Sequence, residues 1–141
     1  MPDNKIALIT GGNKGLGFET ARRLQSEGQT VYIGARNEER GRAAAEELGA
    51  GFVRLDVTDE GSVVEAAAEL ERREGRIDVL VNNAGIREPG MAVDDAGMPQ
   101  PFIQAADLTG ADAMKVYDTN VAGVVRVMHA FLSLLEKSEH P

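Results

Sequence analysis

The sequence contains no cysteine, no tryptophan and only two histidines. Without cysteine the chain can form no disulfide, thiolate nucleophile or thiolate metal ligand, and His129 and His140 are too few for a zinc site. No apolar run approaches the roughly 18 residues of a membrane span, and residues 1–5 are too polar to open a signal peptide. These absences argue against disulfide-rich, metal-centred and membrane proteins, and they favour a cytoplasmic location.

Basic charge is also scarce, because 15 lysines and arginines stand against 23 aspartates and glutamates, for a net charge of -8. Such a field repels nucleic acid and anionic membrane surfaces, so neither is an expected partner. With 43% hydrophobic and 27% charged residues the composition is that of a globular protein, and 141 residues suit one domain.

Short apolar runs alternate with longer amphipathic segments through the first half of the chain, which is typical of βαβ units. The pattern predicts strands over residues 5–10, 30–35, 51–57 and 77–82, and helices over 15–27, 37–48 and 59–74. The helix ends carry suitable residues, with Asn37 and Thr58 or Asp59 as N-caps and Gly28, Gly49 and Gly75 at C-termini. The expected fold class is α/β, a Rossmann-type doubly wound parallel sheet in the order 3-2-1-4 with helices on both faces.

The second half of the chain is predicted to hold a long loop over residues 86–107 and a long helix over residues 110–137. Thr109 and Asp112 form a variant of the capping box at the start of this helix. Its apolar stripe comprises Met114, Tyr117, Val121, Val124, Met128, Leu132 and Leu135, and it is widened by Val125, Val127, Ala130 and Leu134. The width predicts that the helix buries more than one face.

A glycine-rich turn, Thr-Gly-Gly-Asn-Lys-Gly-Leu-Gly over residues 10–17, joins the first predicted strand to the first helix. Glycines let the backbone approach a pyrophosphate, and the helix N-terminus offers free N–H groups and a positive dipole end. The alternative is a glycine-rich turn that binds nothing, but the flanking strand and helix meet the requirements of a dinucleotide site. The candidate ligands here are Gly11, Asn13, Lys14, Gly15, Leu16 and Gly17.

The spacing Thr-Gly-x3-Gly-x-Gly resembles the turn of the short-chain dehydrogenase/reductase family, and three further motifs follow in the family's order. Asp56 closes the third predicted strand, Asn-Asn-Ala-Gly follows the fourth at residues 82–85, and Asn120 lies in the long helix. Residues 11–15 and Arg36 look most like the carbonyl-reductase branch. The resemblance implies that Asp56 and Val57 lie at the adenine, that Asn83, Ala84 and Gly85 pass the cofactor riboses, and that Asn120 occupies the proton-relay position.

The residues after the second predicted strand favour NADP (NADPH) over NAD. An NAD site needs an acid there for the ribose 2′-hydroxyl, but Ala35 is followed by Arg36, whose guanidinium suits a 2′-phosphate. Lys14 supplies a second cation, and the pair resembles that of NADP-dependent members. The alternative is that Arg36 is a solvated cation or a partner of Glu38 or Glu39.

The family's proton donor, Tyr-x3-Lys with an orienting Ser, has no match in the sequence, because Tyr32 is followed four residues later by Arg36 and Tyr117 by Val121. The resemblance implies a parent activity of hydride transfer between NADPH and a small carbonyl or alcohol substrate. Residues 1–141 are expected to form an incomplete domain that is inactive alone. The alternative is a complete, non-catalytic nucleotide-binding or interaction module, and the substrate cannot be identified.

The order 3-2-1-4 leaves the fourth predicted strand at an edge although its sequence, Val-Leu-Val over residues 79–81, is that of a central strand. We therefore expect a neighbour on that side, either further residues of the same protein or another subunit. In relatives the helix matching residues 110–137 commonly packs between subunits. A homo-oligomer through the fourth strand or this helix is the expected assembly.

Overall fold

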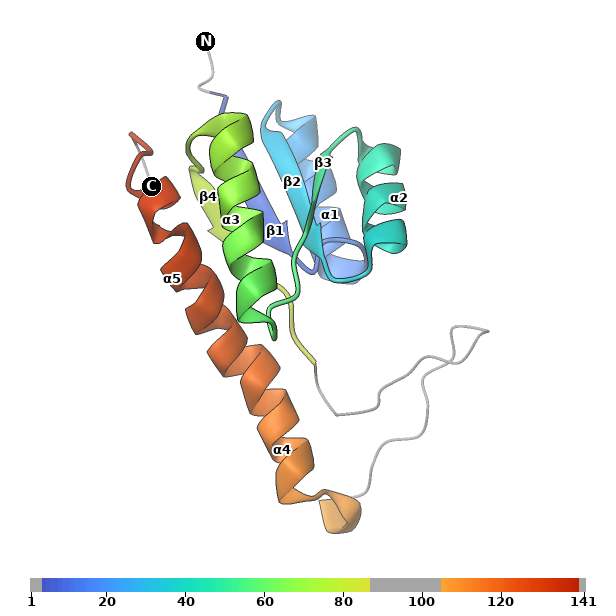
Figure 1. Cartoon of the computed structure of the whole chain (residues 1–141). Coiled ribbons are helices and arrows are strands. Elements are labelled where there is room, and N and C mark those ends of the chain that lie inside the picture. Colours follow the sequence, from blue (N-terminus) through green and yellow to red (C-terminus); the bar gives the residue numbers. More distant parts are fainter. Residues whose placement is uncertain (1–3, 87–104, 140–141) are drawn as a thin grey trace.

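The computed structural model describes residues 4–86 and 105–139 (Figure 1). Its centre is a four-stranded parallel sheet in the order β3-β2-β1-β4. The strands are β1 (Ile6–Thr10), β2 (Thr30–Ala35), β3 (Gly51–Arg54) and β4 (Val79–Val81), and the helices are α1 (Gly15–Ser26), α2 (Glu38–Leu48), α3 (Glu60–Glu74), α4 (Gly110–Tyr117) and α5 (Gly123–Leu135). The predicted Rossmann-type fold and its strand order are confirmed.

The sheet separates two apolar clusters, because alternate residues of a strand point to opposite faces. Leu8 of β1 packs with the buried residues of α3 and α5, including Leu70 and Phe131. Ile9 of the same strand packs on the other face with residues of α1 and α2, such as Ala21 and Ala45. All five residues of β1 are buried, as expected for a parallel strand covered on both faces.

Polar side chains and glycines fix the helix ends close to where the sequence predicts them. Asn37 caps α2 by accepting a hydrogen bond from the Arg40 N–H at 2.9 Å, and Asp59 rather than Thr58 caps α3. The capping box of Thr109 and Asp112 opens α4. These caps satisfy N–H groups that have no partner within the helix, so each fixes the residue at which its helix begins.

Two strands are shorter than predicted. The Leu55 N–H still bonds to the Ala35 carbonyl at 3.0 Å, but the next N–H, of Asp56, lies 2.9 Å from the Ser62 hydroxyl, so the chain leaves the sheet there. Leu55 and Val57 are apolar because they pack in the core, not because they continue β3. At the other strand, Ile77 bonds through its N–H to the Leu134 carbonyl in α5, and β4 begins only at Val79.

The predicted helix over residues 110–137 ends at Leu135 and contains a π-helical turn, Asp118–Ala122, between α4 and α5. Figure 1 shows α4 extending beyond the end of the sheet, while α5 lies along α3. The prediction that more than one face is buried is wrong for the described part of the chain. The core receives Gly123, Val127, Phe131 and Leu134, and no residue of α4 is buried.

The main apolar stripe of this helix faces outward instead, with side chains that are 42–63% exposed. Its members are Met114, Tyr117, Val121, Val125, Met128 and Leu132, and we call them the outer stripe. One helix face is enough to cover α3, so the second apolar face stays largely exposed among the described residues. Of the predicted loop over residues 86–107, residues 87–104 lie outside the described residues, and a short 3-10 helix, Ala105–Asp107, follows.

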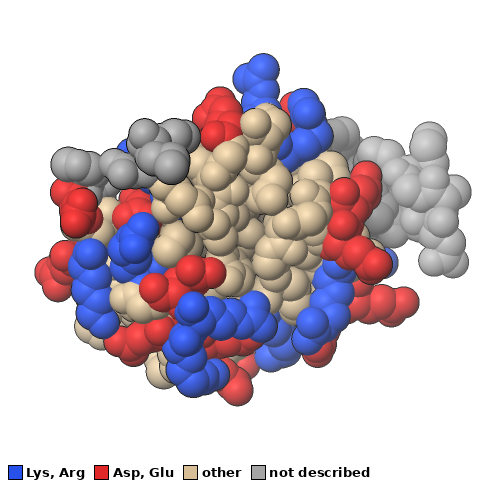
Figure 2. Space-filling view, turned by 90° about the horizontal axis from the view of Figure 1, so that it is seen from above, with Lys and Arg blue, Asp and Glu red and all other residues tan. Residues whose placement is uncertain are grey.

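The two ends of the sheet differ in character. Figure 2 views the molecule from the amino ends of the strands, where an uncharged centre is surrounded by lysines, arginines, aspartates and glutamates. A hollow of about 350 Å³ at this end is lined by uncharged residues such as Asn4, Gln25 and Gln29. Among the described helices, none is long and apolar enough to cross a membrane. The glycine-rich turn and the other predicted site residues lie at the opposite end.

Asp78 joins the start of β1, the start of β4 and the end of α5. Its buried carboxylate accepts hydrogen bonds from the Ile6 N–H at 2.8 Å, the Ser138 hydroxyl at 2.5 Å and the Arg76 guanidinium at 3.2 Å. Burial by itself raises the pKa of Asp78, but the bonds from Ser138, Ile6 and Arg76 outweigh it and hold the pKa below the usual value. The ionised form is therefore the one that stabilises the fold.

Replacement of this carboxylate by an amide, Asp78→Asn, should lower the free energy of unfolding at pH 7 by about 1.5–3 kcal/mol, the usual range for hydrogen bonds to a charged group. Because the folded-state pKa is lowered, this stabilisation is full above the unfolded pKa of about 3.9 and is lost as the pH falls through the folded value. Urea denaturation at pH 7 measures the loss of stability in the variant, and urea denaturation below pH 4 shows whether the difference between the two proteins disappears. The control is Asp107→Asn at an exposed position; equal losses in the two variants would contradict the prediction.

Candidate nucleotide-binding site

Four turns meet at the carboxyl end of the sheet, one after each strand. Because the strands are parallel, the glycine-rich turn after β1, Arg36 after β2, Asp56 after β3 and residues 82–85 after β4 all lie at this end. Ligands of open α/β sheets bind outside the carboxyl ends of the strands. The structure thus brings the sequence-predicted residues to one edge.

The glycine-rich turn packs directly on the turn that follows β4. Gly11 has a φ of +64°, and a Cβ there would lie 2.9 Å from the Ala84 Cα. At Gly17 a Cβ would lie 2.4 Å from the Asn83 side-chain nitrogen, which donates to the Gly11 carbonyl at 3.1 Å. Larger residues at either position would separate the two turns, so these glycines are required for close packing as well as for chain direction.

Thr10, the last residue of β1, holds the two turns together by its hydroxyl. The oxygen accepts hydrogen bonds from the N–H groups of Asn83 and Ala84, each at 3.0 Å, and the side chain is 1% exposed. The same hydroxyl donates to the Val81 carbonyl at 3.5 Å. One buried side chain thereby fixes the backbone of Asn83 and Ala84 relative to the glycine-rich turn.

The N-terminus of α1 differs from those of α2, α3 and α4. No side chain among the described residues accepts a hydrogen bond from its first N–H groups, and its first turn contains no acid. Lys14 stands at the N-cap position, and at Gly15, with a φ of +59°, a Cβ would have nothing within 4 Å. The free N–H groups and the positive end of the helix dipole therefore face open space, as an anion site requires.

The cations predicted to recognise a 2′-phosphate are both exposed. Neither Lys14 nor Arg36 forms a side-chain hydrogen bond or ion pair with another described residue. Glu38, one of the two alternative partners for Arg36, is instead bonded to Arg42 at 2.7 Å. Both cations are thus available to a ligand at this edge.

Asp56 keeps its charge and its orientation in the turn before α3. Partial burial raises the pKa of Asp56, but the Thr58 hydroxyl at 2.7 Å and the Thr58 N–H at 3.0 Å, with the charges of Arg36 and Arg54, outweigh it and lower the pKa. One carboxylate oxygen is committed to Thr58. The arrangement leaves an ionised acceptor beside Arg36, and the buried Val57 follows it.

Asn120 lies in the π-helical turn and reaches across to the chain after β4. Its side-chain oxygen accepts from the Ile86 N–H at 2.7 Å, and its side-chain nitrogen donates to the Ile86 carbonyl at 2.6 Å. A Cβ on Gly85 would lie 3.2 Å from the Asn120 oxygen. The amide therefore fixes the backbone just beyond Asn83, Ala84 and Gly85, and π-helical turns often occur at functional sites.

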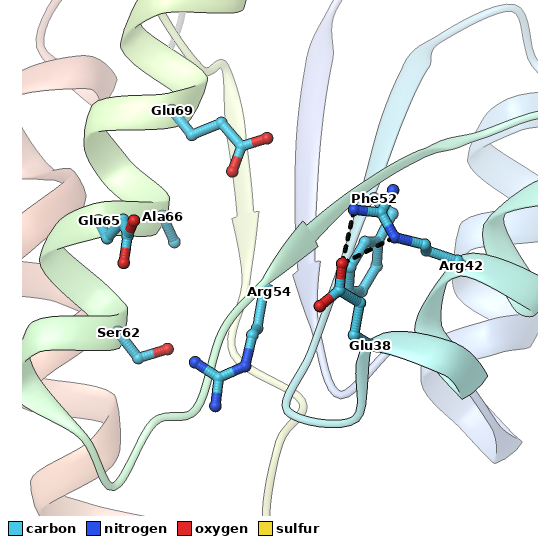
Figure 3. A pocket seen from close by; sticks show the side chains of 8 residues that line it. All are labelled: Glu38, Arg42, Phe52, Arg54, Ser62, Glu65, Ala66 and Glu69. Carbon is cyan, nitrogen blue, oxygen red and sulfur yellow. Dashed lines mark hydrogen bonds and ion pairs between the residues drawn. The ribbon is translucent and has the colours of Figure 1, made fainter.

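A separate hollow of about 170 Å³ lies on the open edge of β3, between α2 and α3 (Figure 3). Figure 3 shows the Arg54 side chain extending from β3 between the two helices, while Glu38 and Arg42 are paired. The lining mixes three glutamates with two arginines, so its charges nearly balance. None of the sequence-predicted ligands lines it, so it is distinct from the candidate nucleotide-binding site.

Sequence reasoning did not assign a role to three residues that organise the site. Thr10 was included in the glycine-rich motif but was given no role. The sequence signal for its role was that a polar residue ends a strand that is otherwise entirely apolar. Ile86 contributes only backbone atoms, which no side-chain pattern reveals. Arg126 bonds to the Val57 carbonyl at 3.1 Å, and its signal was a lone charge in the apolar sequence of α5.

The doubly wound sheet with a glycine-rich turn and an uncapped α1 defines a Rossmann-type nucleotide-binding protein. The family model for short chain dehydrogenase matches residues 5–140. The chain therefore belongs to the short-chain dehydrogenase/reductase family of oxidoreductases, whose members bind nicotinamide cofactors.

Individual proteins similar to this chain support the family assignment. Short-chain dehydrogenase/reductase 1 of Saponaria officinalis is 35% identical over 100% of this chain and 52% of its own length, and (+)-neomenthol dehydrogenase of Arabidopsis thaliana is 32% identical over 97% and 51%. A crystal structure of an actinorhodin polyketide ketoreductase variant with NADPH matches with a TM-score of 0.76 and 36% identity, covering 94% of this chain and 48% of that one. The chain spans about half the length of these relatives.

The Thr10 hydroxyl offers a test of how the two turns are joined. Thr10→Val keeps the shape but removes the hydroxyl that accepts from the Asn83 and Ala84 N–H groups. The Asn83 N–H keeps its bond to the Val81 carbonyl at 3.1 Å, whereas the Ala84 N–H loses its acceptor, so the free energy of unfolding should fall by about 1–3 kcal/mol. Urea denaturation measures the loss. Thr20→Val is the matched control, because among the described residues the Thr20 hydroxyl bonds only to the Leu16 carbonyl within α1. Thr10→Ser should retain most of the stability; a loss in Thr10→Ser as large as in Thr10→Val would contradict the role of the hydroxyl.

Proposed function

We propose that this chain is the NADP(H)-binding portion of a short-chain dehydrogenase/reductase that transfers hydride between NADPH and a carbonyl or alcohol substrate. The observation that carries the proposal is the free, uncapped N-terminus of α1 beside the glycine-rich turn. The Thr10 hydroxyl and the small Gly17 keep this turn packed against Asn83 and Ala84. The arrangement offers backbone donors to a pyrophosphate at a position where α2, α3 and α4 have side-chain caps.

In this proposal, different groups of residues bind different parts of the cofactor. The backbone of Gly11, Asn13, Gly15, Leu16 and Gly17 surrounds the pyrophosphate, which takes hydrogen bonds from the first turn of α1. Leu16, at 82% exposed, is free to cover the cofactor from the solvent side. Asn83, Ala84 and Gly85 present backbone without bulky side chains to the riboses.

The adenine end is assigned to the turns after β2 and β3. Lys14 and Arg36 bind the 2′-phosphate, because both are exposed and free of side-chain partners among the described residues. Asp56 accepts from the adenine amino group through the carboxylate oxygen that Thr58 leaves available, and Val57 lies beneath the ring. This set favours NADP over NAD.

NADPH supplies the hydride when it is bound. Asn120 occupies the relay position of the family, and both its side-chain oxygen and its side-chain nitrogen bond to the Ile86 backbone. We infer that its contribution is to hold the π-helical turn and the Asn83–Gly85 backbone in place beside the reacting end. The relatives' names, a menthol-type dehydrogenase and a ketoreductase, support a small alcohol or ketone as the substrate class.

The outer stripe of α4 and α5 supports a homo-oligomer. Six large apolar side chains lie on one side of the helix, and 42–63% of the surface of each residue stays exposed among the described residues. Contiguous apolar surface of this kind marks an interface, and two-fold symmetry lets the same surface pair with itself. We propose a second copy of the chain as the partner, and we favour this helix over the edge of β4 because the helix carries the exposed large apolar side chains.

The cofactor preference is tested by titrating the chain with NADPH and NADH and following nucleotide fluorescence. NADPH should bind at least tenfold more tightly, a difference of about 1.4 kcal/mol. Arg36→Ala should remove most of this preference by weakening NADPH alone. The matched control is Arg40→Ala, an exposed arginine in the first turn of α2 without a side-chain partner among the described residues. Equal affinity of the unaltered chain for both nucleotides would overturn the NADP assignment.

The assembly is tested by placing a charge on the outer stripe. Val125→Glu, at a side chain that is 63% exposed, should convert the oligomer to monomers because a carboxylate buried between apolar faces is strongly unfavourable. Light scattering after size-exclusion chromatography measures the mass. Val64→Glu, at 56% exposed on α3, is the control and should leave the mass unchanged. A monomeric unaltered chain, or an oligomer that survives Val125→Glu, would contradict the proposal.

A further inference from the structure

Arg126 of α5 is a partly buried arginine, 22% exposed, whose guanidinium bonds to three other segments. One terminal nitrogen donates to the Val57 carbonyl at 3.1 Å and to the Asp118 carbonyl at 3.2 Å. The other lies 2.5 Å from the Asp118 carboxylate, and the inner nitrogen lies 3.5 Å from Glu60. Two of the contacts are to backbone carbonyls, so they fix the path of the backbone. The other two are to carboxylates, which balance the charge of the guanidinium.

The first of these carbonyls belongs to the turn between β3 and α3. This turn is held from within by Asp56, which accepts from Thr58, and by Ser62, which bonds to the Asp56 N–H. The start of α5 packs closely against this turn, since a Cβ on Gly123 would lie 2.9 Å from the Val57 side chain and 3.2 Å from the Val57 carbonyl oxygen. Arg126 adds the only side-chain hydrogen bond to the Val57 carbonyl among the described residues.

The second carbonyl, of Asp118, opens the π-helical turn that carries Asn120. It accepts the Gly123 N–H, five residues on, in place of the usual bond to the fourth residue. By binding both the carbonyl and the carboxylate of Asp118, Arg126 supports the wider turn. Asn120 then reaches the Ile86 backbone from this turn.

These contacts form one path from the turn after β3 to the backbone after β4. Val57 is joined through Arg126 to Asp118, and the π-helical turn is joined through Asn120 to Ile86. The two ends of the path correspond to the adenine end and the ribose end of the proposed nucleotide site. The sheet separates these ends, because β2 and β1 lie between β3 and β4.

We propose that Arg126 is a positioning residue, which holds the Asp56–Val57 turn and the Asn120-bearing π-helical turn in fixed relation so that both ends of one dinucleotide are bound together. The inference rests on the proposed nucleotide-binding function. Arg126 touches no cofactor itself, and it acts by reducing the ordering that the nucleotide must impose on the two turns.

Arg73 of α3 provides a matched control at the other end of β3. It also donates to a backbone carbonyl, that of Phe52, at 3.2 Å, and it also pairs with an acid on its own helix, Glu69 at 2.5 Å. Loss of either arginine removes a hydrogen bond to a backbone carbonyl and an ion pair with an acid; Arg73 in addition lies over the Tyr32 ring, 5.8 Å from its centre. Arg73, however, lies at the amino-terminal part of β3, away from the proposed site, so a general loss of stability can be separated from a loss of positioning.

The experiment compares Arg126→Met and Arg73→Met in the whole chain. Arg126→Met should raise the Kd for NADPH about tenfold, equivalent to about 1.4 kcal/mol, whereas Arg73→Met should leave the Kd within about twofold. Without nucleotide, amide hydrogen exchange should become faster at Thr58 and at Ile86 in Arg126→Met only. If Arg126→Met does not fold, Arg126→Lys, which keeps the charge but not the fork of donors, should show a smaller change in the same direction.

The outcomes separate this inference from the proposed function. An unaltered chain that binds no NADPH refutes nucleotide binding, and unchanged exchange at Ile86 in the Arg126 variant refutes the mechanical link whether or not nucleotide binds. An unchanged NADPH affinity in the Arg126 variant, or an equal loss in both arginine variants, overturns the positioning role. Faster exchange at both amides with weaker NADPH binding in the Arg126 variant alone supports it.

Discussion

The hydroxyl of Thr10 lies where the two halves of the candidate site meet, and it accepts two backbone N–H groups that have no ladder partner. A parallel sheet fixes its strands through its ladders, but the ladder stops where β1 and β4 end. Beyond that point the backbone must find other partners, since a buried unpaired N–H is unfavourable by about 1–3 kcal/mol. Thr10 supplies the acceptor, and the glycines at positions 11 and 17 let the two turns approach closely enough to use it.

The same requirement explains why the helix termini differ. Asn37, Asp59 and Thr109 satisfy the first N–H groups of α2, α3 and α4 with their own side chains. At α1 the corresponding position holds Lys14, which has no acceptor to offer. An uncapped terminus leaves N–H groups whose partner must be solvent or a ligand, so the missing cap is as informative as the glycine spacing.

Local signals made much of the fold predictable. The caps at Asn37 and Thr109 depend on side-chain bonds within three residues, and the order of the strands depends on the repeated βαβ pattern. The end of β3 was not predictable, because Leu55 and Val57 are apolar for the core rather than for the ladder, and period alone cannot distinguish the two. The outer stripe was misjudged for a related reason: Val121 and Val127 have the same hydrophobicity, and only the position of α3 decides which is buried.

The part of the site that could be predicted from the sequence is the part built from recognisable side-chain motifs. Its residues could be placed at one edge of the sheet from the motifs, but Ile86 participates through backbone atoms, and the π-helical turn at Asn120 has no simple sequence signature. Arg126 was visible as a charge in an apolar helix, yet its partners are 8 and 69 residues away. Contacts at such separations depend on the packing of α5 against the turn after β3, which is a property of the assembled fold.

Charge places a further constraint on how this protein can hold an anionic ligand. The chain carries a net charge of -8, so its long-range field repels a dinucleotide. Over more than about 8–10 Å, salt screens this repulsion at physiological ionic strength. Short-range contacts must therefore provide the binding, and the N–H donors proposed at α1 would do so without adding net charge. In the proposed site, Lys14 and Arg36 would place positive charge at the 2′-phosphate, the group that distinguishes NADP from NAD.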